Sequence, residues 1–184
     1  MRMTGLILLA ALAAPAANAV EYQTVLPKQS TIHFEFRQMG VPIKGGFKRF
    51  TTQMVFDPAR PEAASARIEI DLASIDAGSP EADDESAGKL WFNRSVYPKA
   101  IFVSRQVRAL GSNRYEMRGT LTLKGRSREM VVPVTYTPGN NAAVFDGAFV
   151  LRRLDFGIGE GMWADVATVA NEVQVKFRIA ATGD

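Results

Sequence analysis

The sequence predicts an all-β protein whose antiparallel strands close into a sandwich or a barrel. Apolar and polar residues alternate with a period of two in several short runs, as they do in strands with one buried face. Turn-forming residues separate these runs, which favours an antiparallel meander. The composition, with 47% hydrophobic and 22% charged residues, is that of an ordinary globular domain, so neither disorder nor a fibrous repeat is indicated.

The first run lies at residues 30–37, where Ile32, Phe34 and Phe36 share one side of the predicted strand and His33 lies on the other. We expect each such run to form a strand with one face toward a common core. The same alternation recurs at residues 66–72, 115–123, 130–136 and 173–179, and further apolar runs occur around residue 102 and at 145–151.

Short segments of turn-forming residues separate the predicted strands. Gly125 in particular fits a hairpin position that needs a positive φ. The segments are Gly45-Gly46, Asp57-Pro58, Lys124-Gly125 and residues 138–141.

The segment 79–97 breaks the alternation. Pro80 followed by acidic residues is typical of a helix start. We therefore expect one or two helical turns near residues 80–92, lying across the barrel wall or its mouth. Its apolar side chains would then act as a lid: Leu90, Trp91 and Phe92.

Residues 1–19 have the order of a secretory signal peptide. Arg2 supplies a basic start, an apolar stretch follows, and the segment ends in Ala17-Asn18-Ala19, an A-x-A cleavage site. The apolar stretch is too short for a permanent membrane span, which needs about 20 residues; an uncleaved N-terminal anchor is the alternative. We expect cleavage after Ala19, export, and a single mature domain over residues 20–184.

Several classes of chemistry have no support in the sequence. Cysteine is absent, which excludes disulfides, thiol nucleophiles and thiolate metal sites. The single histidine, His33, cannot assemble a multi-histidine metal site and has no recognisable nucleophile beside it. No serine lies in a Gly-x-Ser-x-Gly context, and the glycines form neither a phosphate loop nor a dinucleotide fingerprint. We therefore predict no catalytic residue, no metal and no cofactor.

The charged residues have ordinary interpretations. Asp83, Asp84 and Glu85 resemble paired carboxylates or calcium ligands, but adjacent acids at a helix start more often complement the helix dipole. The formal net charge of +3 is spread along the chain without a Lys/Arg block, so nucleic acid is not expected as a partner.

What stands out is a large supply of bulky apolar side chains, including 11 Phe and 7 Met. A closed barrel of about eight strands has an interior just wide enough for side chains or for one small ligand. An extended hydrocarbon tail would gain roughly 0.8 kcal/mol per buried methylene. Whether the aromatic side chains enclose a ligand or simply fill the interior stays open at this point.

Short signatures follow one another in order along nearly the whole mature chain. They are Ser30-x-Ile32-x-Phe34; Gly45-Gly46-Phe47-x-x-Phe50 with Phe56-Asp57-Pro58; Ile70-x-x-x-Ser74-Ile75-Asp76; Trp91-Phe92 with Tyr97-Pro98-x-Ala100-x-Phe102-x-Ser104; Gly119-x-Leu121-Thr122-Leu123-x-Gly125; and Leu151-x-Arg153-x-Asp155-Phe156-Gly157-Ile158-Gly159. Together they resemble the YceI family of periplasmic, lipocalin-like polyisoprenoid-binding proteins. The chain departs from some members of that family around the predicted mouth, at Ser86, Leu90 and Asn93.

The resemblance implies an eight-stranded antiparallel lipocalin-like barrel with a short helical segment near residues 80–92, located in the periplasm. It also implies that the barrel encloses an amphiphilic isoprenoid lipid of the polyprenyl or quinone type, which the protein sequesters or carries. A membrane-associated donor or acceptor and a homodimer are further partners compatible with this function. The residues expected to bind the ligand are Ile32, Phe34, Phe36, Phe50, Ile68, Ile70, Leu72, Trp91, Phe92, Phe102, Leu121 and Leu123.

Two other functions stay open. An enzyme acting on a bound lipid or quinone would need polar residues around His33 or Asp83 that face the cavity. An interaction module for a membrane redox partner, with no ligand of its own, would have an interior filled by aromatic side chains. We also expect Arg153 and Asp155, two residues apart on one predicted strand face, to form ion pairs with each other or with neighbours in a structural role.

Overall fold

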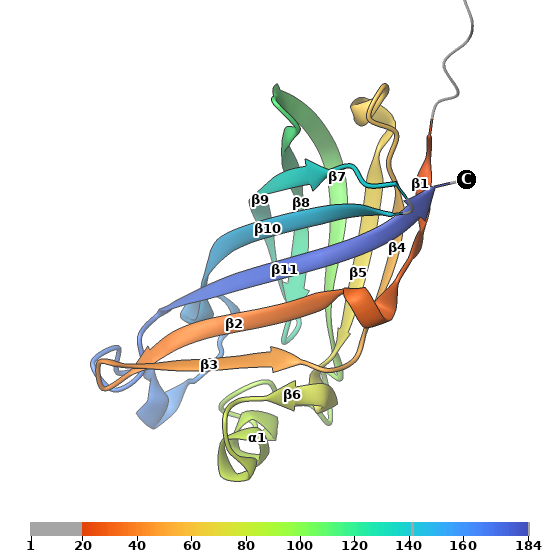
Figure 1. Ribbon diagram of the computed structural model, residues 1–184. Coiled ribbons are helices and arrows are strands. Elements are labelled where there is room, and N and C mark those ends of the chain that lie inside the picture. The colour runs from red at the N-terminus through yellow and green to blue at the C-terminus, as the bar shows by residue number, and fades with distance from the viewer. Residues whose placement is uncertain (1–19, 141, 184) are drawn as a thin grey trace, which may run out of the picture.

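The computed structural model describes residues 20–140 and 142–183, so the predicted signal peptide lies outside the described residues. In this part of the chain, 11 strands form one sheet whose paired strands are antiparallel (Figure 1). The all-β class is therefore confirmed. The strands are β1 (Tyr22–Val25), β2 (Thr31–Gln38), β3 (Val41–Phe47), β4 (Phe50–Val55), β5 (Ser65–Asp71), β6 (Ile75–Asp76), β7 (Lys99–Gly111), β8 (Arg114–Leu123), β9 (Arg126–Thr137), β10 (Ala143–Arg152) and β11 (Glu172–Gly183).

The sheet curls around an interior because two of its strands bend at a corner and continue. β3 passes into β4, and β5 passes into β6 across the 3-10 segment η3 (Leu72–Ser74). β4 pairs with β5 while β3 pairs with β6. Backbone hydrogen bonds join the two pairings at the corner, from Lys48 N to Ser74 O (3.0 Å) and from Asp71 N to Arg49 O (3.1 Å).

The corner explains how the predicted and observed strand numbers differ. If β3–β4 and β5–β6 are each taken as one bent strand, eight strand paths surround the interior of the described chain, and β1 adds a short strand beside β11. The predicted lipocalin-like barrel class is confirmed. The strand number differs from the predicted eight, because the described chain divides these paths into 11 strands. β3 was not recognised because Pro42 and the two glycines interrupt its alternation, and β6 has only two residues.

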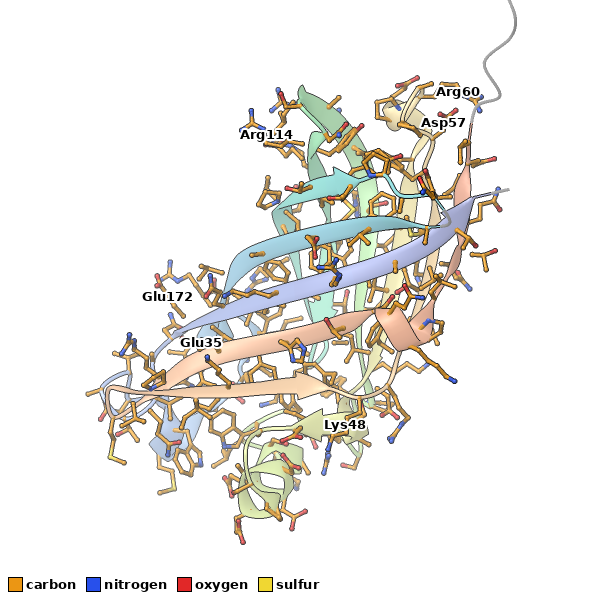
Figure 2. The ribbon with its side chains drawn as sticks, viewed as in Figure 1. Glu35, Lys48, Asp57, Arg60, Arg114 and Glu172 are labelled. Atoms are coloured by element: carbon orange, nitrogen blue, oxygen red, sulfur yellow. The ribbon has the colours of Figure 1, made fainter. Side chains whose placement is uncertain are left out.

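Two predicted turns are confirmed. Lys124-Gly125 joins β8 to β9 with φ values of 49° and 72°, as expected in a two-residue hairpin. Asp57 lies in the turn after β4, where it accepts a hydrogen bond from Ala59 N (2.8 Å) and pairs with Arg60 (2.8 Å). Figure 2 shows Asp57 and Arg60 side by side at one end of the barrel.

The prediction of a turn at Gly45-Gly46 is wrong, because both glycines lie inside β3. Gly45 lies opposite Phe34 of β2, and a Cβ at Gly45 would collide with the Phe34 ring. The glycine therefore makes room for an aromatic side chain on the neighbouring strand. β2 and β3 turn instead at Met39 and Gly40, with φ values of 48° and 80°.

At the end of the barrel where Asp57 lies, side chains fill the interior apart from a void of about 60 Å³. Aromatic rings from several strands meet here, and we call this set the aromatic plug: Tyr22, Phe56, Tyr115, Tyr136 and Phe145. The Phe56 ring centroid lies 5.0 Å from that of Phe145, 5.1 Å from Tyr115 and 5.2 Å from Tyr136. The Tyr136 hydroxyl donates to the Tyr22 hydroxyl at 3.1 Å, which satisfies a polar group inside the plug.

The helix α1 (Pro80–Ala87) follows β6 and packs below the sheet corner (Figure 1). The Ser79 hydroxyl accepts a hydrogen bond from Ala82 N at 3.2 Å, and Pro80 occupies the first turn, as N-terminal capping predicts. The predicted helical segment near 80–92 is thus confirmed but shorter, because the chain leaves the helix at Gly88. Within the described residues, no helix is long and apolar enough to cross a membrane.

Candidate ligand-binding cavity

A cavity of about 570 Å³ occupies the half of the barrel opposite the aromatic plug. Its wall is mainly apolar and comes from the inward faces of the strands, from α1, and from the segments 91–92 and 153–169. Three lining residues, Ser79, Glu81 and Glu85, are exposed to solvent. The cavity therefore reaches the surface beside α1, and we call this opening the mouth.

Most of the residues predicted to bind a ligand lie along this cavity. They come from strand β2, from the β5 corner, from the segment after α1 and from β8. These residues are Ile32, Phe34, Phe36, Ile70, Leu72, Trp91, Phe92, Leu121 and Leu123. Trp91 and Phe92 form part of the wall near the mouth, which is the position predicted for a lid.

Phe50, Ile68 and Phe102, also predicted to bind the ligand, do not lie along the large cavity. Phe50 packs against the cluster that contains the aromatic plug. Ile68 borders a separate void of about 60 Å³, and Phe102 packs between the two apolar clusters of the interior. All three pack into the interior. Alternation reports the face of a strand and not which part of the interior a side chain enters: Phe50 lies opposite Ile70, which does line the cavity.

The cavity also has lining residues that the sequence-based prediction left out. Several of them carried a usable signal, because Leu151, Val173 and Val175 lie in runs recognised as strands. Phe47 likewise lies in the Gly-Gly-Phe signature. The additional lining side chains are Gln38, Phe47, Ile75, Ala77, Ala82, Ser86, Ala100, Phe149, Leu151, Arg153, Ile158, Trp163, Val169, Val173 and Val175.

Polar side chains of the cavity gather near the mouth. α1 and its cap supply Ser79, Glu81, Glu85 and Ser86. Glu85 Oε1 accepts a hydrogen bond from the Trp163 indole Nε1 at 2.9 Å, which links α1 to the 3-10 segment η5 (Gly161–Ala164). The mouth thus combines an acidic helix with an aromatic wall.

Arg153 is a fully buried cation in the cavity wall, with only 2% of its surface exposed. Every N–H of its guanidinium is committed to a backbone carbonyl, an arrangement that can hold a charge away from water. Burial lowers the pKa of Arg153. The acceptors, at 2.6 to 3.0 Å, are the carbonyl oxygens of Ile158, Gly159, Trp163, Val169 and Ala170.

This geometry corrects the expected pairing of Arg153 with Asp155. Both residues lie in the 3-10 segment η4 (Arg153–Phe156), not on a strand, and Asp155 is exposed. Arg153 instead organises the connection between β10 and β11 around itself. Gly159 permits this packing, because its φ is +75° and a Cβ there would collide with the Arg153 guanidinium.

The residues named for an enzymatic role do not line the cavity. His33 is exposed on the outer face of β2. Asp83 Oδ1 accepts a hydrogen bond from Ala77 N at 2.6 Å, so its carboxylate ties the helix to the segment before it. Across the described ranges 20–140 and 142–183, no group of three His, Cys, Asp or Glu side chains is placed to hold a metal ion.

A model of the YceI-like domain family matches residues 23–181. The chain belongs to the YceI-like domain family. A UPF0312 protein of Vibrio cholerae is 30% identical to this YceI-like domain over 170 residues, which cover 86% of this chain and 90% of that protein. The matched range includes all the signatures from Ser30 to Gly159.

Solved structures extend the similarity to three dimensions. BcnA of Burkholderia cenocepacia matches this YceI-like domain with a TM-score of 0.84 and 41% identity, covering 86% of this chain and 99% of that one. A polyisoprenoid binding domain from Saccharophagus degradans shares the fold with a TM-score of 0.69 and 14% identity, covering 91% of this chain and 100% of that one. At this identity the second likeness concerns the fold.

Proposed function

We infer that this YceI-like domain binds an amphiphile with a long isoprenoid tail and sequesters or carries it. The observation that carries the proposal is the cavity of about 570 Å³ with an apolar wall and an opening beside α1. Small-molecule sites are typically clefts of about 300–1,000 Å³ with mostly apolar walls and a few polar groups. The polyisoprenoid binding described for the Saccharophagus degradans domain supports the choice of tail.

The division of the interior explains how a tail would be held. Side chains such as Phe36, Ile70 and Leu123 line the hollow half, and burial of a tail against them contributes roughly 0.8 kcal/mol per methylene. The aromatic plug closes the other half. A tail entering at the mouth therefore ends against the plug, and a longer tail would have to fold back or protrude.

The polar residues of the mouth favour a neutral head group. Glu81 and Glu85 place carboxylates beside the opening, while each guanidinium N–H of Arg153 already has a carbonyl partner. A phosphate would meet these carboxylates without a charged donor from Arg153. A quinone, quinol or polyprenyl alcohol carries no charge and would not be repelled by these carboxylates. The hydroxyl of a quinol or alcohol could also donate to Ser86 Oγ, whose own proton goes to Asp83 O at 2.6 Å.

Two further parts of the proposal concern location and chemistry. Export to the periplasm rests on the signal peptide predicted at residues 1–19 and its cleavage site after Ala19. Cleavage there would leave β1, which begins at Tyr22, intact. N-terminal sequencing of the exported protein should start at Val20; a membrane-bound product that retains Met1 would contradict this. A binding role without catalysis is supported by the positions of His33 and Asp83 outside the cavity wall.

Mass spectrometry of organic extracts from natively purified protein tests the binding proposal directly. We expect a neutral isoprenoid at a nearly equimolar amount. A control extract comes from a Leu121→Trp variant, in which a bulkier side chain projects into the cavity from β8. This variant should carry far less lipid while remaining folded by circular dichroism. Equal lipid in both extracts, or none in the wild type after reconstitution with a polyprenol, would overturn the proposal.

A further inference from the structure

We propose that the mouth of the cavity docks on the surface of a lipid bilayer of zwitterionic character, through a ring of exposed apolar side chains. The inference rests on the proposed function, because a protein that takes up a water-insoluble lipid must meet the membrane that holds it. We call this ring the apolar rim. Its residues are Met39, Val41, Leu90, Met162 and Val166.

The apolar rim contains the two most exposed large apolar side chains of the described chain, Met162 at 77% and Met39 at 73%. Soluble proteins scatter single exposed apolar residues over their surface, but contiguous groups mark sites of interaction. Methionine is flexible and polarisable, which suits contact with a disordered apolar phase. The exposure therefore calls for a partner that is itself apolar.

Backbone contacts hold the rim segments together. Met39 N donates to Thr168 O at 2.8 Å, which joins the β2–β3 turn to the segment that carries Val166. Gly159 N and Glu160 N both donate to Leu90 O at 2.8 Å, and this brings Leu90 next to η5, which carries Met162. Figure 1 shows the β2–β3 turn and the connection between β10 and β11 at the same end of the barrel.

The rim is continuous with the cavity wall. Gln38, Trp163 and Val169 line the cavity, and each lies within three residues of a rim residue in the sequence. A lipid tail leaving the bilayer at the rim would pass directly onto these side chains. Since the same segments form the wall and the rim, docking would bring the mouth to the membrane without a change of fold.

Charge selects the kind of surface. The rim segments 39–43, 161–164 and 166–170 contain no charged residue. Beside them lie Asp165 and the basic residues Lys89 and Arg37. α1, which borders the same mouth, adds four acidic residues and no basic one, so acidic residues outnumber basic ones here: Glu81, Asp83, Asp84 and Glu85. Anionic lipids attract basic clusters, so this end of the molecule should prefer a zwitterionic surface, where apolar burial alone drives association.

The matched variants are a Met39→Gln/Met162→Gln pair in the rim and Val131→Gln on the outer face of β9. Val131 is an exposed apolar residue at 49%, but it lies outside the mouth. Glutamine keeps roughly the length of methionine while removing its apolar character. A second rim pair, Val41→Ser/Val166→Ser, repeats the test with different side chains should the first fold poorly. All proteins are purified in the same form, so that any contribution of residues 1–19 is common to them.

The experiment measures flotation with phosphatidylcholine vesicles, and with vesicles that also contain phosphatidylglycerol. We expect the ligand-free wild type to float with the phosphatidylcholine vesicles independently of salt. It should float less with the vesicles that contain phosphatidylglycerol, and added salt should reduce this difference. Each double variant of the rim should lower the bound fraction about tenfold, because burial of these apolar side chains supplies much of the free energy of membrane binding. Val131→Gln should behave as wild type.

Ligand binding is measured separately, by titration of a short-chain polyprenol in vesicle-free solution. Unchanged affinity in the rim variants, together with their loss of flotation, supports docking at the rim. A wild type that binds the polyprenol but does not float overturns the docking proposal alone, and so does equal flotation of wild type and rim variants. Loss of self-association in the rim variants, without any wild-type flotation, would assign the rim to a second copy of the chain. A wild type that binds no polyprenol overturns the proposed function instead.

Discussion

The guanidinium of Arg153 lies over the indole ring of Trp91, with 5.8 Å between the Arg153 Cζ atom and the ring centroid. The contact joins the β10–β11 connection to the segment after α1, two parts of the cavity wall that are far apart in the sequence. A cation over an aromatic face contributes about 0.5–2 kcal/mol, with the larger values at desolvated sites. Arg153 therefore links the β10–β11 connection, through its hydrogen bonds, to the segment after α1, through Trp91.

Replacing Arg153 by lysine should destabilise the protein although the charge is retained. Lysine has three donors where arginine has five, so some of the carbonyls that Arg153 satisfies would be left buried and unpaired. Each such group costs about 1–3 kcal/mol, and we expect the free energy of unfolding in urea to fall by about 2–5 kcal/mol. Arg152→Lys, at the exposed neighbouring position, is the control. A change in Arg153→Lys no larger than in the control would contradict the structural role of the guanidinium.

Truncation in the hollow and solid halves of the barrel should have different effects. Phe56 is 5% exposed and packed among aromatic rings. Phe56→Ala should therefore lower the free energy of unfolding by about 3–5 kcal/mol. Phe36 borders the cavity, so Phe36→Ala creates less new void. It should lower the free energy of unfolding clearly less than Phe56→Ala does. It should instead weaken polyprenol binding.

Urea unfolding of the delipidated variants and a polyprenol titration measure both effects. Ile70→Ala, another cavity residue, should follow Phe36→Ala. Full-size destabilisation by Phe36→Ala with unchanged affinity would show that this side chain belongs to a packed core and not to a binding wall.

The contrast between the two halves also marks how far the sequence could go. The alternation in β2, β5 and β8 predicted correctly which side chains face inward. It could not distinguish Ile70 in the hollow half from Ile68 one step deeper, because both occupy the same face of one strand. Whether an inward side chain lines the cavity depends on where the aromatic plug ends. That boundary is set by rings from strands that are distant in the sequence.

The environment of Arg153 was beyond sequence reasoning for a different reason. Its partners are backbone carbonyls of residues 5 to 17 positions later. Every residue type has such a carbonyl, so the sequence does not show which ones accept a hydrogen bond. Asp155 was the natural candidate because it is the nearest opposite charge. The glycine at 159 was the usable signal, since a position without a Cβ beside a large side chain often marks close packing.

The head-group preference can be tested with ligands that share one tail. We expect a polyprenyl alcohol to bind more tightly than the corresponding polyprenyl phosphate, because Glu81 and Glu85 lie at the mouth. A Glu81→Gln/Glu85→Gln variant should narrow the difference by improving phosphate binding, while alcohol binding stays the same. Glutamine at position 85 retains an oxygen for the Trp163 indole N–H. Tighter binding of the phosphate by the wild type would contradict this preference and would show that basic side chains other than Arg153 bind the head group.

The aromatic plug should make stability sensitive to alkaline pH. Burial raises the pKa of Tyr136, and its hydrogen bond with Tyr22 raises it further; burial also raises the pKa of Tyr115. The folded protein then keeps these phenol protons at pH values where the unfolded chain, with a tyrosine pKa of about 10, releases them. The unfolding free energy should therefore hold its full value below about pH 10 and fall as the pH rises above it.

Urea midpoints measured between about pH 8 and pH 11 would follow this loss. In a Tyr115→Phe/Tyr136→Phe variant the fall above about pH 10 should be shallower, whatever the variant costs at neutral pH. An equally steep fall in the variant would place the alkaline transition elsewhere in the molecule.

The pairing of β1 with β11 brings both ends of the described chain to the plugged end of the barrel, with Tyr22 opposite Gly183 (Figure 1). The mouth lies at the other end. A fluorophore, affinity handle or solid support attached through either end would thus leave the opening facing away from the attachment. Immobilised this way, the domain would present its binding cavity outward, an orientation suited to capturing hydrophobic molecules from a flowing sample.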